Sequence, residues 1–487
     1  MPNTGMANKD KNNSSSQPDN PGFQDFSTTP LIPREITEKA RLYKATNLLK
    51  NQHPDVSASH PKQALAVELL VFAFFLLFIT YLLLPSVAAM TVASLCLLLV
   101  LNEMVCLARP PQRQKRDREL KQADLPTYTV LLPLFKEAHM IPQLVKAMAA
   151  LHYPPERLEI LFIVEEEDET TFKAVKTGLA LGELHAKTDI IIVPPSRPQT
   201  KPKACNYALT FAKGSLIVVY DAEDRPHPDQ LREAAELFAA SQGDKTCLQA
   251  PLVIRDRNYD LLGALMALNY TTQFNLQMSA NARLGLPVFF GGTSNHMRRR
   301  DLADIGGWDP HNVTEDAELS LRMVKQGYKI GMLDRPTYET ATRGVWNHLT
   351  QRCRWQKGSF QTLSAHFGSL NRSELKPLQA CHVTLMLINR IMSPLFYLLL
   401  LLSMALMEFP PLTLHSFTGQ VIVLCLVMLI FLNLCACLHQ RRFGLLLAVP
   451  LLPLHWLFLS LTFLFAIEQL LSNPSYWHKT PHNEWTE

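Results

Sequence analysis

The segment Leu216-Ile-Val-Val-Tyr-Asp-Ala-Glu-Asp224 decides the fold of this chain, because a short apolar run passes directly into acidic residues. A short apolar run bounded by polar residues is typical of a strand buried on both faces of a parallel sheet. Ligands of such sheets bind at the carboxyl ends of the strands. We therefore expect Asp221, Glu223 and Asp224 at the binding edge of an α/β sheet.

Similar apolar runs surround this segment between about Leu125 and Pro377, with amphipathic helical stretches between the early ones. Strands that alternate with helices predict a largely parallel sheet covered by helices on both faces. The middle of the chain is therefore expected to be an α/β domain. The strands expected in addition to Leu216–Tyr220 are Tyr128–Phe135, Glu159–Val164, Asp189–Val193 and Cys247–Ile254.

Long apolar runs flank this domain. The runs 64–84 and 87–107, separated near Pro85, each approach the roughly 20 residues of a transmembrane helix and predict a helical hairpin. The basic stretch 109–118 follows, and Lys and Arg are enriched on cytoplasmic flanks, so the α/β domain is expected in the cytosol. Further apolar runs lie at 383–407, 420–438 and 443–471.

The last apolar run leaves two topologies open. Its length suits one long span, which would place the C-terminus outside the cell. Pro450 and Pro453 also permit a break into an interfacial piece and a true span, which would return the C-terminus to the cytosol.

The composition excludes several classes of protein. The 487 residues have a net charge of only +4 and their basic residues cluster beside apolar runs, so no nucleic-acid partner is expected. The nine cysteines form no C-x-x-C pair, which predicts reduced thiols without a zinc or redox site. Residues 1 to about 55 are polar, which predicts a disordered tail, with a short helix near Pro33–Leu49.

Two acidic groups follow expected strands. Asp221, Glu223 and Asp224 can together reach one Mg²⁺ or Mn²⁺ ion, since hard cations take oxygen ligands and commonly bridge to phosphate. The alternative is an acidic turn that ends the strand. The second group, Glu165-Glu-Glu-Asp-Glu169, can accept hydrogen bonds from a nucleotide base or ribose. A solvated loop face is the alternative for this group.

A third acidic group, Thr314-Glu-Asp316, opens an amphipathic helical run. Thr314 can cap this helix, so Glu315 and Asp316 fall in its first turn, where the helix dipole favours ionised carboxylates. An ionised carboxylate suits a general base. Simple capping chemistry is the alternative.

The segment Gln351-Arg-Cys-Arg-Trp355 combines arginines with an aromatic ring shortly before the apolar runs. Arginine suits a diphosphate, and Trp355 offers a face for a sugar. The alternative is an interfacial amphipathic helix that anchors at lipid headgroups. Lys201 and Lys203 precede another helical stretch and suit phosphate, although a surface lysine pair would look the same.

Taken in order, these motifs resemble the family-2 inverting glycosyltransferases, in particular the membrane branch of cellulose and hyaluronan-type polysaccharide synthases. The resemblance covers roughly residues 127–361 and implies a cytosolic GT-A (Rossmann-like) domain. Glu165 and Glu166 stand where the family has two aspartates that hold uracil and ribose. Asp221-Ala-Glu223 stands in place of the D-x-D metal motif, with Asp224 able to share its role.

The resemblance also implies a mechanism. The T-E-D motif is intact, so Asp316, with Glu315 beside it, is expected to deprotonate the acceptor hydroxyl in a single in-line displacement that inverts the anomeric carbon. Mg²⁺ or Mn²⁺, Lys203 and Arg354 would stabilise the diphosphate that leaves a UDP-sugar. The implied nucleotide-sugar site comprises Glu165, Glu166, Lys201, Lys203, Asp221, Gln351, Arg354 and Trp355, and the implied metal ligands are Asp221, Glu223 and Asp224.

Six regions are predicted: a disordered cytosolic tail (1–60), a two-helix transmembrane hairpin (61–108), the GT-A domain (109–345), interfacial helices with the QxxRW motif (346–380), a C-terminal transmembrane region (381–473) and a C-terminal tail (474–487). In the tail, Trp477, Lys479 and Thr480 resemble the gating segment of such synthases. The expected location is a bacterial inner membrane, with export proteins as further partners.

The acceptor expected from the resemblance is a growing polysaccharide. A membrane lipid that receives one sugar is an alternative, because ceramide glucosyltransferases carry the same Q-x-x-R-W type of motif. A non-catalytic membrane component that retains the fold is a second alternative, against which the complete set of acids, Asp316 included, argues.

Overall fold

The computed structural model describes most of the chain. It covers residues 38–59, 83–109, 119–366, 373–405 and 416–474, except 242 and 256–259, together with a few single residues outside these ranges. Most of the predicted tail and of the predicted first span, 64–84, lies outside the described residues.

A mixed seven-stranded sheet forms the centre of the α/β domain. Its strands lie in the order β3-β2-β1-β4-β8-β6-β9, and all neighbours are parallel except the two pairs that β8 makes. The predicted largely parallel sheet is therefore present, with one antiparallel strand inserted. In sheet order the strands are β3 (Lys187–Val193), β2 (Leu158–Glu165), β1 (Tyr128–Leu134), β4 (Leu216–Val219), β8 (Asn295–Arg298), β6 (Thr246–Gln249) and β9 (Lys329–Met332).

The prediction of one strand at Cys247–Ile254 was wrong, because this segment forms two strands in different sheets. β6 belongs to the large sheet, whereas β7 (Leu252–Ile254) pairs in a small sheet with β10 (Thr337–Glu339), which also pairs with β5 (Arg225–Pro226). Pro251 lies between β6 and β7 and has no amide hydrogen to donate, so the pairing changes there.

The large sheet buries both faces, as its apolar strands predict. In β4, Ile217 and Val219 pack into one hydrophobic cluster, and Leu216 and Val218 pack into another. Alternate side chains of a strand point to opposite faces, so each cluster marks one face. The first face is covered by α6 (Lys201–Leu209), α10 (Arg299–Asp304) and α11 (Glu315–Lys325), and the second by α4 (Ile141–Ala149), α5 (Glu169–Ala180) and α7 (Gln230–Ala240).

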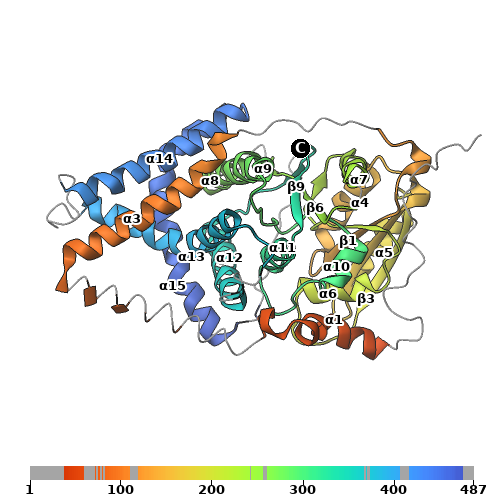
Figure 1. Cartoon of the computed structure of the whole chain (residues 1–487). Coiled ribbons are helices and arrows are strands. Elements are labelled where there is room, and N and C mark those ends of the chain that lie inside the picture. Colours follow the sequence, from red (N-terminus) through yellow and green to blue (C-terminus); the bar gives the residue numbers. More distant parts are fainter. Residues whose placement is uncertain are drawn as a thin grey trace, which may run out of the picture.

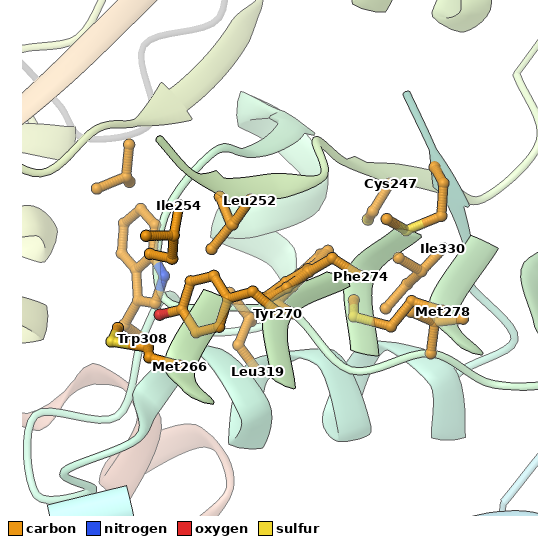
Figure 2. Packing of buried hydrophobic residues seen from close by; sticks show 14 of the residues in the cluster. Cys247, Leu252, Ile254, Met266, Tyr270, Phe274, Met278, Trp308, Leu319 and Ile330 are labelled. Carbon is orange, nitrogen blue, oxygen red and sulfur yellow. The ribbon is translucent and has the colours of Figure 1, made fainter. Parts of the chain in front are cut away.

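A continuous helical segment joins the sheet to the rest of the molecule. It consists of α8 (Leu261–Tyr270), the π-helical stretch η7 (Thr271–Met278) and α9 (Ser279–Arg283). Figure 2 shows Tyr270, Phe274 and Met278 of this segment. They lie between Leu252 of β7 on one side and Leu319 of α11 on the other. The same hydrophobic cluster also includes residues of the long apolar helices described next, so one core serves both parts of the chain.

Three described segments are long and apolar enough to cross a membrane, namely Ser86–Ala108, Phe417–His439 and Phe443–Ser472. The long helices gather on one side of the molecule and the large sheet on the other, with α8, α11 and α12 between them (Figure 1). The helices on this side are α3 (Pro85–Met104), α13 (Pro377–Ala405), α14 (Phe417–His439) and α15 (Leu452–Ser472), and the intervening α12 spans Val345–His366.

The last apolar run changes from 3₁₀ to α geometry at its prolines but remains one helical segment, Phe443–Ser472. The 3₁₀ segment η10 (Phe443–Leu451) packs against α8 and α14, and α15 begins at Leu452, between Pro450 and Pro453. Beyond α15, Lys357 of α12 donates a 2.7 Å hydrogen bond to the carbonyl oxygen of Tyr476. The described end of the chain therefore lies against α12.

The helix predicted near Pro33–Leu49 is α1 (Glu38–Gln52). The predicted residues before Glu38 lie outside the described part of the chain. It packs along α6. The Asn206 side chain of α6 donates to the carbonyl oxygens of Ala45, at 3.1 Å, and Trp308, at 2.8 Å. This contact fixes α6 from the side that faces away from the sheet edge.

A buried ionic cluster holds α11 against α12. The Glu318 carboxylate accepts hydrogen bonds from Arg322 at 2.8 and 3.0 Å and contacts His366 Nε2 of α12 at 3.1 Å. Burial raises the pKa of Glu318, but Arg322 and His366 lower it more, to about 2. Glu318 is thus ionised at neutral pH and fixes the helix that begins with the Thr-Glu-Asp motif.

Candidate active site

A cavity of about 1210 Å³ lies at the carboxyl ends of β1, β2 and β4, where the sheet meets α11, α12 and the long helices. Its wall brings together residues from every acidic and basic motif singled out in the sequence. Those on the wall are Glu165, Lys201, Asp221, Glu223, Glu315, Asp316, Gln351, Arg354 and Trp355.

The acidic turn after β4 presents Asp221 to the cavity. Lys201, at the start of α6, places its Nζ 2.5 Å from Asp221 Oδ1 and donates to the carbonyl oxygen of Gly292 at 2.9 Å. Burial lowers the pKa of Lys201, but Asp221 and Glu315 raise it more, so the net shift is upward. The cavity therefore contains a permanent ammonium group next to a carboxylate.

Asp224, unlike Asp221 and Glu223, does not line the cavity. Its carboxylate accepts a hydrogen bond from the Asp221 amide at 2.7 Å and another from the Thr293 hydroxyl. Burial, with the charges of Asp221 and Glu223, raises the pKa of Asp224 well above its usual value. Asp224 is buried behind the cavity wall and closes the turn that orients Asp221.

The donor set of the cavity determines whether a divalent cation can bind there. In the part of the chain that the structure describes, no three His, Cys, Asp or Glu side chains converge on a common point. Asp221 and Glu223 both reach the cavity. Mg²⁺ is commonly held by one or two carboxylates together with substrate phosphates. These two residues therefore fit a cation that is shared with a diphosphate.

The acidic run after β2 contributes Glu165 and Glu167 to the cavity wall, whereas Glu166 is exposed outside it. Glu165 Oε2 lies 3.1 Å from Lys203 Nζ, and both side chains are buried. Lys203 is therefore the counterion of Glu165 behind the wall, and Lys201 is the lysine that faces the cavity. Gln199 donates to Glu167 at 2.7 Å.

The Thr-Glu-Asp motif lies at the start of α11 and lines the same cavity as Asp221. Asp316 Oδ2 accepts a 2.5 Å hydrogen bond from the amide of Gly292, which adopts a positive φ of 75°. Burial raises the pKa of Glu315 to about 7, with Lys201 lowering it and Asp316 raising it. Glu315 thus faces the lysine, while Asp316 is oriented by the glycine bend before β8.

The Gln-x-x-Arg-Trp motif lies on α12 and forms another wall. Arg354 Nη1 donates to the carbonyl oxygen of Val313 at 3.3 Å. Burial lowers the pKa of Arg354, and the charges of Glu315, Asp316 and Asp221 oppose this shift. The guanidinium group of Arg354 therefore lies near these three carboxylates on the same cavity.

Trp355 is held between two neighbours. Its ring stacks on Tyr270 with 6.5 Å between centroids and 25° between planes. Arg352 lies over the Trp355 ring at 4.4 Å and donates to Asn269 at 3.2 Å. Arg352, the first arginine of the segment, therefore fixes the orientation of the tryptophan.

Three residues of the predicted gating segment, Trp477, Lys479 and Thr480, lie outside the described residues. The chain just before them reaches the cavity, because Pro474 and Tyr476 line it. Gln361 of α12 donates to the carbonyl oxygen of Pro474 at 2.9 Å. The C-terminal segment therefore leaves α15 at the edge of the site.

Gly358→Ala is expected to lower turnover by about ten- to a hundredfold, because small displacements of reacting groups have effects of this size. A Cβ at position 358 of α12 would lie 2.2 Å from the Thr314 hydroxyl and 2.7 Å from its Cβ, so the Thr-Glu-Asp motif must move. Steady-state kinetics of sugar transfer would measure the effect. Gly444→Ala is the matched control, since nothing lies within 4 Å of a Cβ there. Equal turnover in both variants would contradict this account.

Residues 216–472, more than half of the chain, match the family model described as "Glycosyl transferase family group 2". The chain belongs to this family. The predicted family-2 glycosyltransferase is thereby confirmed, as is the mixed α/β fold of its catalytic domain.

Relatives of this family-2 protein include synthases that are named for different products. A beta-monoglucosyldiacylglycerol synthase of a Nostoc species is 25% identical over 261 residues, which cover 53% of each chain. Cellulose synthase 2 of Novacetimonas hansenii is 24% identical over 292 residues, covering 56% of this chain and 17% of the synthase. The chain thus spans about half the length of the first relative and less of the second.

Among solved structures, the mannosyltransferase PcManGT from Pyrobaculum calidifontis, in complex with GDP-Man and Mn²⁺, is similar in fold. The TM-score is 0.50 at 18% sequence identity, and the match covers 79% of this chain and 97% of the mannosyltransferase. At this identity the similarity supports the fold alone.

Proposed function

We propose that this glycosyltransferase moves a sugar from a nucleotide diphosphate sugar, preferably a UDP-sugar, onto a hydroxyl group of an acceptor at the membrane, with inversion at the anomeric carbon. This proposal rests mainly on one observation. A single cavity is lined by Asp316, Lys201, Asp221 and Arg354. A base, two cations and an acidic metal ligand are the groups that such a displacement needs.

The nucleotide would bind where the strands of the large sheet end. Glu165 and Glu167 offer carboxylate oxygens to the donors of a base or ribose. Lys203 neutralises Glu165 from behind, so that this acid can remain charged in a buried place. Glu166 was predicted in this role, but Glu167 lines the cavity and Glu166 does not, which favours Glu167 as the second acid.

The diphosphate would lie between Lys201 and Arg354, with Trp355 beside the sugar. A Mg²⁺ or Mn²⁺ ion held by Asp221 and Glu223 would supply Lewis-acid stabilisation of the leaving group when bound. The Lys201 ammonium group, which contacts Asp221, adds a second positive charge beside the leaving diphosphate. Asp224, predicted as a third ligand, supports the turn instead.

Asp316 would act as the general base. Its carboxylate takes the proton of the acceptor hydroxyl as the oxygen forms a bond to the anomeric carbon. The bond from that carbon to the diphosphate breaks, and the electron pair leaves with the diphosphate, whose charge faces Arg354. No covalent bond between sugar and enzyme is formed, so a single displacement inverts the configuration.

The proposed acceptor is a growing polysaccharide, with a membrane lipid as the second candidate. Similarity to a cellulose synthase favours the polymer, and similarity to a glucosyldiacylglycerol synthase favours the lipid. We propose a bacterial inner membrane as the location, with the bilayer around the long helices and the sheet domain in the cytosol. Contact of the described C-terminal residues with α12 favours a cytosolic C-terminus and the gating role of the segment beyond it.

Purified protein is expected to release nucleoside diphosphate from one class of nucleotide sugar when Mg²⁺ or Mn²⁺ is present, and to stop when the cation is chelated. The reason is that the carboxylates of Asp221 and Glu223 would repel a diphosphate unless a cation lies between them and the phosphate oxygens. A screen of nucleotide sugars with each metal, read by nucleoside diphosphate release and product mass, measures this. Full activity in the presence of a chelator would contradict the metal-dependent form of the proposal.

A further inference from the structure

The cavity does not end at Asp316. It continues between α3, η7, α13 and α14, where its wall is formed by polar side chains on otherwise apolar helices, such as Glu103, Gln277, Asn389 and Asn433. Its volume of about 1210 Å³ exceeds the ~300–1,000 Å³ typical of a pocket for one small ligand. The cavity therefore has room for a second substrate.

Glu103 is the centre of this polar region. Asn389 of α13 donates to Glu103 Oε1 at 2.8 Å, and Gln277 of η7 donates to Oε2. Each carboxylate oxygen has further lone pairs, and each amide keeps a carbonyl oxygen that can accept a hydrogen bond. This arrangement presents alternating donors and acceptors on the cavity wall.

Arg390 connects this region with the proposed base. It follows Asn389 on α13, lies over the Phe289 ring at 4.9 Å, and interacts electrostatically with both Asp316 and Glu103. Glu103 and Asp316 therefore line one cavity with Arg390, and both carboxyl groups act electrostatically on the same guanidinium.

A second set of polar contacts extends the same wall. Thr272 donates to Asn433 Oδ1 at 2.9 Å, and His382 contacts Asn281 at 3.5 Å. The Oδ1 atom of Asn281 is buried and has no hydrogen-bond partner among the described residues. Polar groups in apolar helices are costly and usually mark a ligand path or site.

We propose that this part of the cavity is the acceptor subsite and that it binds the hydroxyl-rich end group of the acceptor through Glu103, Asn389 and Gln277. The inference rests on the proposed function and identifies the acceptor chemistry as a polyol, such as a sugar or glycerol unit. Hydroxyl groups donate to Glu103 and accept from the two amides, in the way that these side chains already bond to one another. The polyol is either the end of a glycan or the head of a lipid.

The test measures transfer with Glu103→Gln and Asn389→Ala in the full-length protein, using the donor that the wild type accepts. Cellotetraose probes the glycan source, and phospholipid vesicles containing diacylglycerol probe the lipid source. The KM for the acceptor that the wild type uses is expected to rise about three- to tenfold, the effect of losing one hydrogen bond. Donor KM and donor hydrolysis by water are expected to stay unchanged.

Thr384→Val is the matched control, because Thr384 lies on α13 outside the cavity wall and bonds only to the Ala380 carbonyl oxygen of its own helix among the contacts described. If Glu103→Gln does not fold, Asn389→Ala and Gln277→Ala decide the matter. An unchanged acceptor KM, or a parallel loss of donor hydrolysis, would overturn the subsite. A wild type that turns over no nucleotide sugar would overturn the proposed function itself, which is a different result.

Discussion

Asp316→Asn is expected to reduce sugar transfer by about 10²–10⁴-fold, the usual contribution of a positioned general base. Asparagine has the same shape and can still accept the hydrogen bond from the Gly292 amide, so the motif should keep its place. It cannot take a proton from the acceptor. The turnover number should therefore fall while the affinity for the nucleotide sugar changes little, as kinetics and donor binding by calorimetry would measure.

Asp304→Asn serves as the control for this substitution. Asp304 ends α10 on the surface, where it pairs with Arg300, and its side chain is 65% exposed. The same change there should leave transfer intact. Wild-type turnover in Asp316→Asn would exclude Asp316 as the base and favour Glu315 or a role outside catalysis.

Arg354→Met is expected to lower turnover by about 10²–10³-fold, as the loss of one preorganised charge at a leaving group commonly does. Arg354 lies among Asp221, Glu315 and Asp316, whose charges would repel an incoming diphosphate without it. Donor KM should therefore rise as well. Arg354→Lys keeps the charge but loses the planar pair of donors, so it should recover only part of the activity.

Arg300→Met is the matched control, because Arg300 is 70% exposed on α10, away from the cavity. Release of nucleoside diphosphate over a range of donor concentrations separates effects on KM and turnover. A normal turnover with normal donor KM in Arg354→Met would contradict the placement of the diphosphate.

Much of the fold could be predicted because its strands carry a strong pattern. β1, β2 and β4 are buried apolar runs, and all three lie where the sequence predicts them. β8 was missed because Asn-His-Met-Arg has no apolar pattern, and its place comes from pairing with strands distant in sequence. The strands of the small sheet have only two or three residues, too few to show a period.

The residue types of the candidate site could be predicted from the sequence better than the directions in which their side chains point. Lys201 and Lys203 look equivalent in the sequence, but residues two apart on a helix point to different sides, so one faces the cavity and the other Glu165. The chain turn similarly separates Asp221 from Asp224. Glu103 and Asn389 were not singled out, although an isolated acid or amide in an apolar run is itself a signal.

The shared hydrophobic core has a consequence for how the protein folds. One cluster joins Ile217 of the sheet with Leu99 of α3, Cys425 of α14 and Trp456 of α15. The catalytic domain therefore has no complete surface of its own on that side, and the cavity lacks a wall until the long helices have packed. On this architecture, the packing of the long apolar helices and the completion of the candidate active site are one folding event.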